Sequence, residues 1–275
     1  MTTRIPSHFD NSPLFEAIFE VRFLPEFSFA SKLLGFFLPN IMKMHDGSIP
    51  PFQPQDGLNF PKELKDQDKN LYYLPSFKFV LEDISVTISD GSVTISQDKF
   101  YFPYQGWSIF RQHIAKTMDV LLQAIEFSKI ERFSLKYVDI LEHKVVEDGL
   151  AFLNFKAHLG QTDLSKTIFN LQFEQKIESD IVVVTQLAPS VTMDIQQNAL
   201  SVFKKATTPP SSKLKGLLLT TDTICFFPRT VEAYRDEGID ILFDKRLDHL
   251  HTISKEKFMH SFTEQALESL GVHYE

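Results

Sequence analysis

Apolar and charged residues alternate along residues 14–23, a run that Pro13 and Pro25 bound. Five of its apolar side chains, Phe19 among them, share one side of the run, and its three charged side chains share the other side with Leu14 and Ile18. Successive side chains of a β-strand point to opposite faces, so this pattern predicts a strand with one face buried. Residues 131–141 alternate in a similar way and predict a second strand of this kind.

Residues 86–95 show the clearest local pattern, two alternating runs joined by Asp90 and Gly91. Asp-Gly is a preferred pair for a two-residue hairpin turn, because both turn positions require a positive φ that these residues tolerate. Such a turn would pair Ile88 with Val93 across the hairpin. We therefore expect two short strands joined by a tight turn.

Two helices are expected around this hairpin. Residues 28–38 have helical character, with Ser28 as the expected N-cap and Pro39 as the residue that stops the helix. Residues 107–126 place apolar side chains at helical spacing, with polar side chains between them. Residues 45–75 are rich in Pro, Asp, Gln and Lys and show no periodicity, which predicts a long surface excursion.

Residues 1–145 thus follow the order strand, helix, two-stranded hairpin, helix, strand. This βαββαβ order is that of a ferredoxin-like unit. Its first and last strands lie side by side, so the two alternating runs would be neighbours in space. We expect residues 1–145 to form one lobe of the protein.

Residues 146–275 follow a different pattern, after a stretch at 143–149 that resembles a hinge. Alternating runs rich in β-branched and aromatic residues predict an antiparallel meander at 150–158, 166–178, 180–195 and 215–227. Residues 204–215 predict a flexible loop, and helical periodicity leads to Leu270, with Gly271 as a C-cap. The predicted fold class is α+β with two lobes, each an antiparallel-rich sheet packed by helices.

Composition narrows the class of protein. The chain has 275 residues, of which 43% are hydrophobic and 23% charged, as expected for a globular protein with a substantial core. Phe occurs 27 times against one Trp and seven Tyr, so aromatic side chains should fill much of the interior. The net charge of −8 disfavours a surface that attracts nucleic acid as a whole, and it would suit a basic protein partner.

Three sequence features bear on the cellular location of the protein: apolar stretches, a signal peptide and cysteines. No apolar stretch reaches the roughly 18 residues of a membrane-spanning helix, and the N-terminus lacks a signal-peptide pattern. Cys225 is the only cysteine, so no internal disulfide can form. Its apolar neighbours predict a buried, unreactive thiol rather than a nucleophile. Together these features predict a cytoplasmic protein.

The segment Asn11–Phe23, Asn-Ser-Pro-Leu-Phe-Glu-Ala-Ile-Phe-Glu-Val-Arg-Phe, resembles the N-terminal signature of a sporadically distributed family of uncharacterised bacterial and archaeal proteins. Trp107 near a helix start, Arg132–Asp139 and Leu217–Asp222 also fall where that family has corresponding segments. The chain departs from the pattern with Ser12 for Pro, Ser134 for Gly, Lys136 for Arg and Asp139 for Asn. The resemblance implies no reaction or cofactor. The family's patchy distribution implies an accessory gene, of the kind found in mobile or defence-related loci.

Charged side chains of the two alternating strands form the leading candidate for a binding surface. Alternation places the following residues on one side of their strands: Glu16, Glu20 and Arg22 in the first, and Arg132, Ser134 and Lys136 in the last. If the strands are adjacent, carboxylates and cations interleave on one sheet face. The pattern fits a lattice of ion pairs worth about 0.2–1 kcal/mol each. It also fits a groove between the lobes that binds a peptide, a nucleotide or a partner strand.

Two further sets of charged residues are weaker candidates. Asp240, Asp244, Asp248 and His251 have the spacing that would stack them on one helix face, where they could hold a divalent metal. Acidic rows on helices more often face water. Lys204, Lys205, Lys213 and Lys215 lie in a stretch without acids and could contact nucleic-acid phosphates. A solvated, mobile loop is the ordinary interpretation of such lysines.

These observations favour a non-catalytic binding or adaptor protein that recognises a protein partner or macromolecular assembly, without a cofactor. The chain has no Gly-rich phosphate loop, nucleophile elbow or Cys-x-x-Cys motif that would argue for an enzyme. An alternative is a small-molecule or lipid-binding protein, with helices over an aromatic-rich sheet enclosing a Phe-lined pocket. A third hypothesis, a metal-dependent enzyme, would require carboxylates clustered in a cleft.

Overall fold

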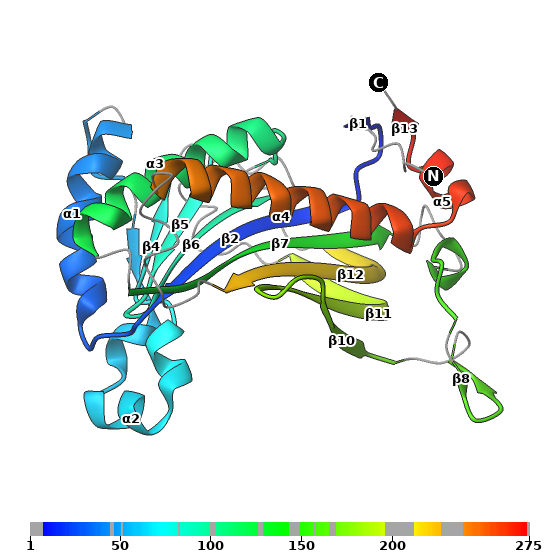
Figure 1. The fold of residues 1–275 in the computed structure, drawn as a ribbon, viewed down its shortest axis with the longest axis horizontal. Coiled ribbons are helices and arrows are strands. Elements are labelled where there is room, and N and C mark those ends of the chain that lie inside the picture. The colour runs from blue at the N-terminus through cyan, green and yellow to red at the C-terminus, as the bar shows by residue number, and fades with distance from the viewer. Residues whose placement is uncertain are drawn as a thin grey trace.

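A computed structural model gives the structure of the chain. It describes residues 8–44, 47–50, 52–81, 83–99, 103–125, 129–142, 149–156, 158–164, 169–195, 212–226 and 239–273. These residues form an α+β fold, in which helices pack on a large antiparallel sheet (Figure 1). The predicted fold class is confirmed at this level.

Nine strands of the described residues form one sheet, in the order β10-β11-β12-β7-β2-β6-β5-β4-β3. Their bounds are β2 (Leu14–Phe23), β3 (Phe52–Pro54), β4 (Phe77–Val80), β5 (Ser85–Ile88), β6 (Ser92–Asp98), β7 (Ile130–Glu142), β10 (Leu171–Lys176), β11 (Ile181–Ile195) and β12 (Ser212–Phe226). All neighbouring strands are antiparallel. Two short pairs lie outside this sheet, β1 (His8–Phe9) with β13 (Val272–His273) and β8 (His158–Leu159) with β9 (Thr162–Asp163).

The helices lie between these strands in the sequence. Their bounds are α1 (Phe29–Met44), α2 (Lys62–Gln67), α3 (Trp107–Ala124), α4 (Ile239–Ser261) and α5 (Glu264–Ser269), with short 3₁₀ helices η1 (Asp56–Asn59), η2 (Lys69–Tyr73) and η4 (Gly149–Phe152). Figure 1 shows α4 running along the sheet, where it packs on β7 and β12. The short strands β1 and β13 meet beyond its end.

The two alternating runs are neighbouring strands, as predicted. β2 pairs antiparallel with β7, and Phe19 lies opposite Leu135 with both side chains buried. On the other face Glu20 lies opposite Ser134. β7 also pairs with β12, so the sheet continues from residues 1–145 into residues 146–275. The predicted hinge falls largely on residues 143–148, which lie outside the described residues.

One face of the sheet carries the core. Buried side chains from β2, β7, α1, α3 and α4 belong to a large apolar cluster that includes Phe19, Phe110 and Leu250. A second, smaller cluster gathers under the last turns of α4 and includes Leu217 and Phe262. Several Phe side chains are fully buried, as their abundance predicted. Cys225 is also buried, and burial raises the pKa of its thiol to about 12, which fits an unreactive cysteine.

The predicted hairpin has the expected register, with Ile88 opposite Val93. Its turn is different, because neither Asp90 nor Gly91 has a positive φ. Instead, the hydroxyl of Ser89 accepts the backbone N–H groups that follow, at 3.2 Å from Gly91 and 2.7 Å from Ser92. These side-chain bonds replace the backbone geometry that the Asp-Gly pair suggested.

Because the Ser89 hydroxyl stabilises the turn, the side chain of Asp90 is available to cap helix α1. Its carboxylate accepts the N–H of Ser28 at 3.2 Å and that of Ala30 at 2.9 Å, and it pairs with Nζ of Lys65 at 2.8 Å. The side chain that caps the start of α1 is therefore that of Asp90, and not that of Ser28, which has a φ of 63°. A distant residue in sequence performs the role that the local pattern assigned to Ser28.

Helix α1 is longer than predicted, because it continues through Pro39 to Met44. A proline leaves the carbonyl four residues earlier without its hydrogen bond and crowds it. In α1 that residue is Gly35. Burial of Phe37 and Ile41 on both sides of the proline holds the helix against the core. Tertiary packing outweighs the local signal.

Three other segments differ from the sequence prediction. The expected strand at 150–158 is instead led by the 3₁₀ helix η4. The excursion at 45–75 contains β3, η1, α2 and η2 and is anchored by buried Lys65 and Tyr72. β12 begins at Ser212, inside the stretch predicted to be a loop, because residues 212–216 pair with β11.

Candidate functional site

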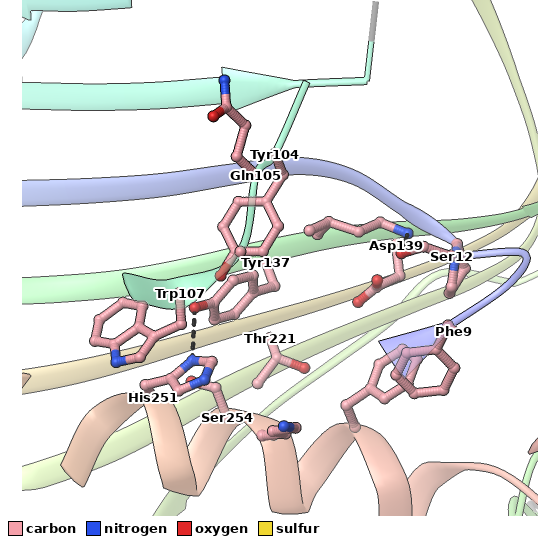
Figure 2. A pocket seen from close by; sticks show the side chains of 15 residues that line it. Phe9, Ser12, Tyr104, Gln105, Trp107, Tyr137, Asp139, Thr221, His251 and Ser254 are labelled. Carbon is pink, nitrogen blue, oxygen red and sulfur yellow. Dashed lines mark hydrogen bonds between the residues drawn. The ribbon is translucent and has the colours of Figure 1, made fainter. Parts of the chain in front are cut away.

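A partly open cavity of about 560 Å³ lies beneath α4, on the helix-covered face of the sheet (Figure 2). It separates the two apolar clusters, because Tyr104, Trp107 and Tyr137 pack against the large cluster, whereas Phe9 and Phe258 pack against the small one. Its volume falls in the range of roughly 300–1,000 Å³ that is typical of small-molecule sites.

Small side chains explain why the core is incomplete at this place. Thr221 on β12 and Ser254 on α4 line the cavity where larger apolar residues would fill it. The hydroxyl of Ser254 is engaged by Thr223, with 2.7 Å between the two oxygens, and it donates to the carbonyl of Leu250 at 2.9 Å. Both contacts hold Ser254 to its own helix and to the sheet, so the space remains open.

Asp139 is the most unusual residue of the cavity. It lies on β7 with only 4% of its surface exposed, and it lines the cavity. No group in the described part of the chain donates a hydrogen bond to its carboxyl. Burial raises the pKa of Asp139 to about 8, so the carboxyl is largely protonated at neutral pH. Figure 2 shows it between Tyr137 and Ser12.

Tyr137 and His251 link the sheet to α4 on the cavity wall. The Tyr137 hydroxyl lies 2.9 Å from Nδ1 of His251 (Figure 2), and the imidazole stacks on Trp107 with ring centres 4.3 Å apart and planes 7° apart. The indole N–H of Trp107 donates to Asp248 at 2.9 Å. Four side chains from α3, β7 and α4 therefore position one another.

Burial sets the protonation of this group. It lowers the pKa of His251 to about 4, an effect to which nearby Lys255 adds, so the imidazole is neutral at pH 7. It raises the pKa of Tyr104 to about 12 and that of Tyr137 well above its usual value. At neutral pH the cavity therefore holds neutral phenols, a neutral imidazole and a largely neutral carboxyl. Lys255, half-buried on α4, is the cationic side chain among the lining residues.

The sequence contained a signal for this site that the prediction missed. Tyr137 and Asp139 share the alternation of Phe133 and Leu135, so they must point to the core face of β7. A carboxylate at a core-facing strand position is costly unless it has a partner or a ligand. The prediction followed the opposite face of the same strand. It also could not foresee that α4 would lie over β7 at this point.

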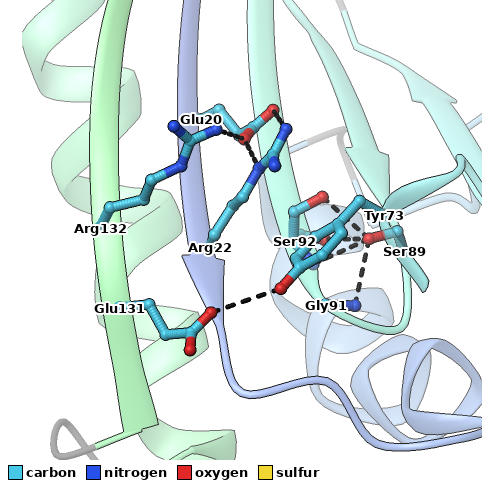
Figure 3. A network of polar contacts seen from close by, with 8 residues as sticks. All are labelled: Glu20, Arg22, Tyr73, Ser89, Gly91, Ser92, Glu131 and Arg132. Atoms are coloured by element: carbon cyan, nitrogen blue, oxygen red, sulfur yellow. Dashed lines mark hydrogen bonds and ion pairs between the residues drawn. The ribbon is translucent and has the colours of Figure 1, made fainter. Parts of the chain in front are cut away.

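The predicted polar surface exists on the other face of the sheet, and its charges pair mainly with one another (Figure 3). Glu20 bonds to the guanidinium of Arg22 and lies 3.6 Å from Nη2 of Arg132. The guanidinium of Arg22 also lies over the ring of Tyr73, 4.6 Å from its centre. Tyr73 donates to Glu131 at 3.3 Å. This arrangement fits the ion-pair lattice that the alternation allowed.

Glu16 and Lys136 lie farther along the same face. Glu16 is half-buried, and burial raises its pKa, with Asp98 adding to the effect and the charge of Lys136 opposing it. Lys136 lies opposite Asp222 on β12, and burial raises the pKa of Asp222 as well. One oxygen of Asp222 is buried without a hydrogen-bond partner in the described structure. The face is thus a set of compensating charges across β2, β7 and β12.

The weaker candidates are not brought together as metal or phosphate sites. Asp248 binds Trp107, and His251 binds Tyr137, while the side chains of Asp240 and Asp244 lie outside the described residues. No group of three or more potential metal ligands is found among the described residues.

The predicted lysine loop is only partly described. Lys213 and Lys215 are exposed on strand β12, which corrects their assignment to a loop, because this part of β12 pairs with β11. Lys204 and Lys205 lie outside the described residues.

Comparisons with known proteins add no relative. No family model matches the chain, and no curated protein matches it. The resemblance to a sporadic prokaryotic family therefore stays a prediction. None of the helices among the described residues is long and apolar enough to cross a bilayer.

Proposed function

We propose that the chain is a non-catalytic binding protein whose cavity beneath α4 takes a small organic molecule. One observation carries this proposal: the buried carboxyl of Asp139 faces a cavity of about 560 Å³ and has no partner among the described residues. Burial raises the pKa of Asp139 to about 8, so the protein supplies no partner that stabilises the ionised carboxyl. A ligand that bonds to Asp139 would supply one.

The walls of the cavity also support a small-molecule ligand. Its lining combines aromatic surfaces with a few polar groups, the usual composition of such sites. Phe9 and Phe258 form an edge-to-face pair with ring centres 5.7 Å apart at one end, and Tyr104 and Tyr137 form another, 6.4 Å apart. The predicted Phe-lined pocket is therefore proposed in altered form, with tyrosines and a tryptophan beside the phenylalanines.

A protein partner on the polar sheet face is the second candidate function. Exposed Phe226 lies opposite Arg132 in the sheet register, next to the ion pairs of Glu20. An exposed aromatic ring beside charges is a common feature of protein interfaces. The internal pairing of these charges disfavours this candidate, because a partner would have to compete with contacts already made.

We also propose that the described strands and helices form two lobes on one sheet. The order β7-β2-β6-β5 supports a ferredoxin-like unit formed by these strands with α1 and α3. The strands from β10 to β12, with α4 and α5, would form the second lobe on the same sheet. We further propose that the protein is cytoplasmic and encoded in an accessory locus, as the sequence suggested.

The proposed function is tested with an uncharged apolar dye, N-phenyl-1-naphthylamine. Its emission rises in apolar sites, and bound dye should quench Trp107, the only tryptophan and a residue of the cavity wall. We expect saturable one-to-one binding with quenching. Ser12, exposed at the cavity rim, offers a blocking variant, Ser12→Phe, which should abolish binding.

Ser31→Phe is the matched control, because Ser31 is exposed on α1, away from the cavity lining. It should bind the dye as the unmodified protein does. Absence of saturable binding, or equal binding by both phenylalanine variants, would refute the proposal. Circular dichroism of each variant establishes that the fold is retained.

A further inference from the structure

We propose that the ligand of this cavity is an organic cation, an amine whose ammonium group pairs with Asp139 while its apolar body packs against the aromatic walls. This inference rests on the proposed function of the cavity. It adds the chemical class of the ligand, which the size of the cavity alone does not determine.

The carboxyl of Asp139 points to this class through its lack of donors. When ionised, a carboxylate offers only acceptors, and no N–H or O–H of the described residues fills them. An ammonium group brings three donors and a positive charge. Opposite charges attract more strongly at a buried position such as Asp139 than in bulk water, so the pair would hold Asp139 in its ionised form. A neutral ligand would supply a hydrogen bond without that charge.

The aromatic walls suit the same ligand. Tyr104, Tyr137 and Trp107 line the cavity with Asp139. Aromatic faces carry negative electrostatic potential and attract cations, and Trp and Tyr do so most strongly. His251 covers one face of the Trp107 ring, so the tyrosines provide most of the free aromatic surface nearby. The same rings would pack against an apolar body.

The cationic side chain among the residues that line the cavity, Lys255, belongs to α4. Lys255 depresses the pKa of His251, whereas burial alone accounts for the raised pKa of Asp139. The imidazole itself is neutral at pH 7. A cationic ligand at Asp139 would therefore meet an unpaired carboxyl. An anionic ligand is the competing hypothesis, because it could pair with Lys255.

Three probes of nearly equal size separate these hypotheses: 2-phenylethylamine, 2-phenylethanol and 3-phenylpropionate. Each is titrated at pH 7 into the full-length protein, by displacement of N-phenyl-1-naphthylamine and by calorimetry. We expect the amine to bind at least tenfold more tightly than the alcohol and the carboxylate. In Asp139→Asn this preference should disappear. Asp119→Asn, at an exposed position on α3, makes the same change of charge and should keep the preference.

The possible results are decisive for the ligand class. An alcohol or carboxylate that binds as tightly as the amine would overturn the inference, as would an amine preference that survives in Asp139→Asn. Dye binding without any binding of the amine would also overturn it while leaving the cavity function intact. Failure of the dye itself to bind would refute the proposed function. The probe comparison on the unmodified protein remains informative even if a variant fails to fold.

Discussion

The hydroxyl of Tyr137 on β7 lies 2.9 Å from Nδ1 of His251 on α4, inside the cavity. This hydrogen bond fixes the helix over the strand at the point where the core is incomplete. Because His251 also stacks on Trp107, the state of the imidazole should be reported by the only tryptophan of the chain. The same contact makes the cavity wall sensitive to acid.

Protonation of His251 should destabilise the fold. Its pKa is lowered to about 4, whereas an unfolded histidine titrates near 6.5. Between these values the unfolded chain binds a proton that the folded chain does not, so this contribution to stability is present above pH 6.5 and lost as pH falls toward 4. Between pH 7 and 4.5 the free energy of unfolding should fall for both proteins. We expect it to fall by about 2 kcal/mol less in His251→Gln than in the unmodified protein. Urea unfolding at both pH values measures this, and equal losses would contradict it.

Asp139 should have the opposite pH dependence. Its pKa rises to about 8 on folding, from near 3.9 in the unfolded chain. The contribution of Asp139 to stability is therefore greatest below pH 4 and is lost as pH rises toward 8, because the unfolded chain releases a proton that the folded chain keeps. Asp139→Asn should be more stable than the unmodified protein at pH 8 by a few kcal/mol, on the order of 3.

The gain from Asp139→Asn should shrink toward pH 4, where the carboxyl of the unfolded chain also begins to bind a proton. Urea midpoints at pH 4, 6 and 8 follow the difference. Asp119→Asn, an exposed substitution of the same type, should change stability by less than about 0.5 kcal/mol. A variant at Asp139 that is less stable than the unmodified protein at pH 8 would show that the carboxyl has a stabilising partner.

The buried pair of Lys65 and Asp90 should contribute strongly to stability. Both side chains are nearly inaccessible, and Asp90 also caps α1. Lys65→Met leaves the carboxylate buried without its cation, which typically costs about 3–5 kcal/mol. Chemical unfolding should show this loss. The double variant Lys65→Met with Asp90→Asn should recover part of it, because no buried charge remains.

Lys69→Met provides the control for this pair. Lys69 is exposed and pairs with Asp66 at 3.1 Å, so its removal should cost at most about 1 kcal/mol. Losses of equal size at Lys65 and Lys69 would mean that the buried pair has no special role in joining the α2 segment to the hairpin and α1.

Gly271 should be required to hold Phe9 in place at one end of the cavity. Gly271 has a φ of +66°, and an added Cβ would lie 2.6 Å from Oδ2 of Asp10. Gly271→Ala should therefore disturb the pairing of β13 with β1, the strand that carries Phe9. It should lower the free energy of unfolding by about 1–2 kcal/mol. It should also weaken binding of N-phenyl-1-naphthylamine, as measured by fluorescence titration.

Gly35→Ala serves as the comparison for Gly271→Ala. Gly35 lies in α1 with nothing within 4 Å of an added Cβ. Alanine is favoured over glycine in a helix, so this substitution should be neutral or stabilising by up to about 1 kcal/mol. Dye affinity should be unchanged. A Gly271→Ala protein with normal affinity would show that β1 is not needed to form the site.

The strands and helices with strong periodicity could be predicted from sequence. β2 and β7 follow simple alternation, so their adjacency and the position of Phe19 and Leu135 on the core face were foreseeable from sequence, whereas the register that pairs these two residues was not. Features set by distant contacts were not. Asp90 was placed correctly in a turn, but its role as the cap of α1 depends on the folded arrangement of three segments.

In the candidate site, too, features with a local sequence pattern could be predicted and features set by distant contacts could not. Charge alternation drew attention to Glu20 and Arg22, whose partners proved to be each other and Arg132. The cavity depends instead on where α4 lies over the sheet, and no local pattern records that placement. Asp139 was detectable in principle, because it is a carboxylate on the core side of a strand.

The most direct test of the central claim is a crystal structure with 4-bromophenethylamine bound, using the anomalous signal of bromine. We predict one strong bromine peak in the cavity beneath α4, with the ammonium nitrogen within hydrogen-bonding distance of the Asp139 carboxylate. Binding that saturates in solution while the bromine lies elsewhere, such as on the face of Glu20 and Arg132, would contradict the account. So would an empty cavity under those conditions.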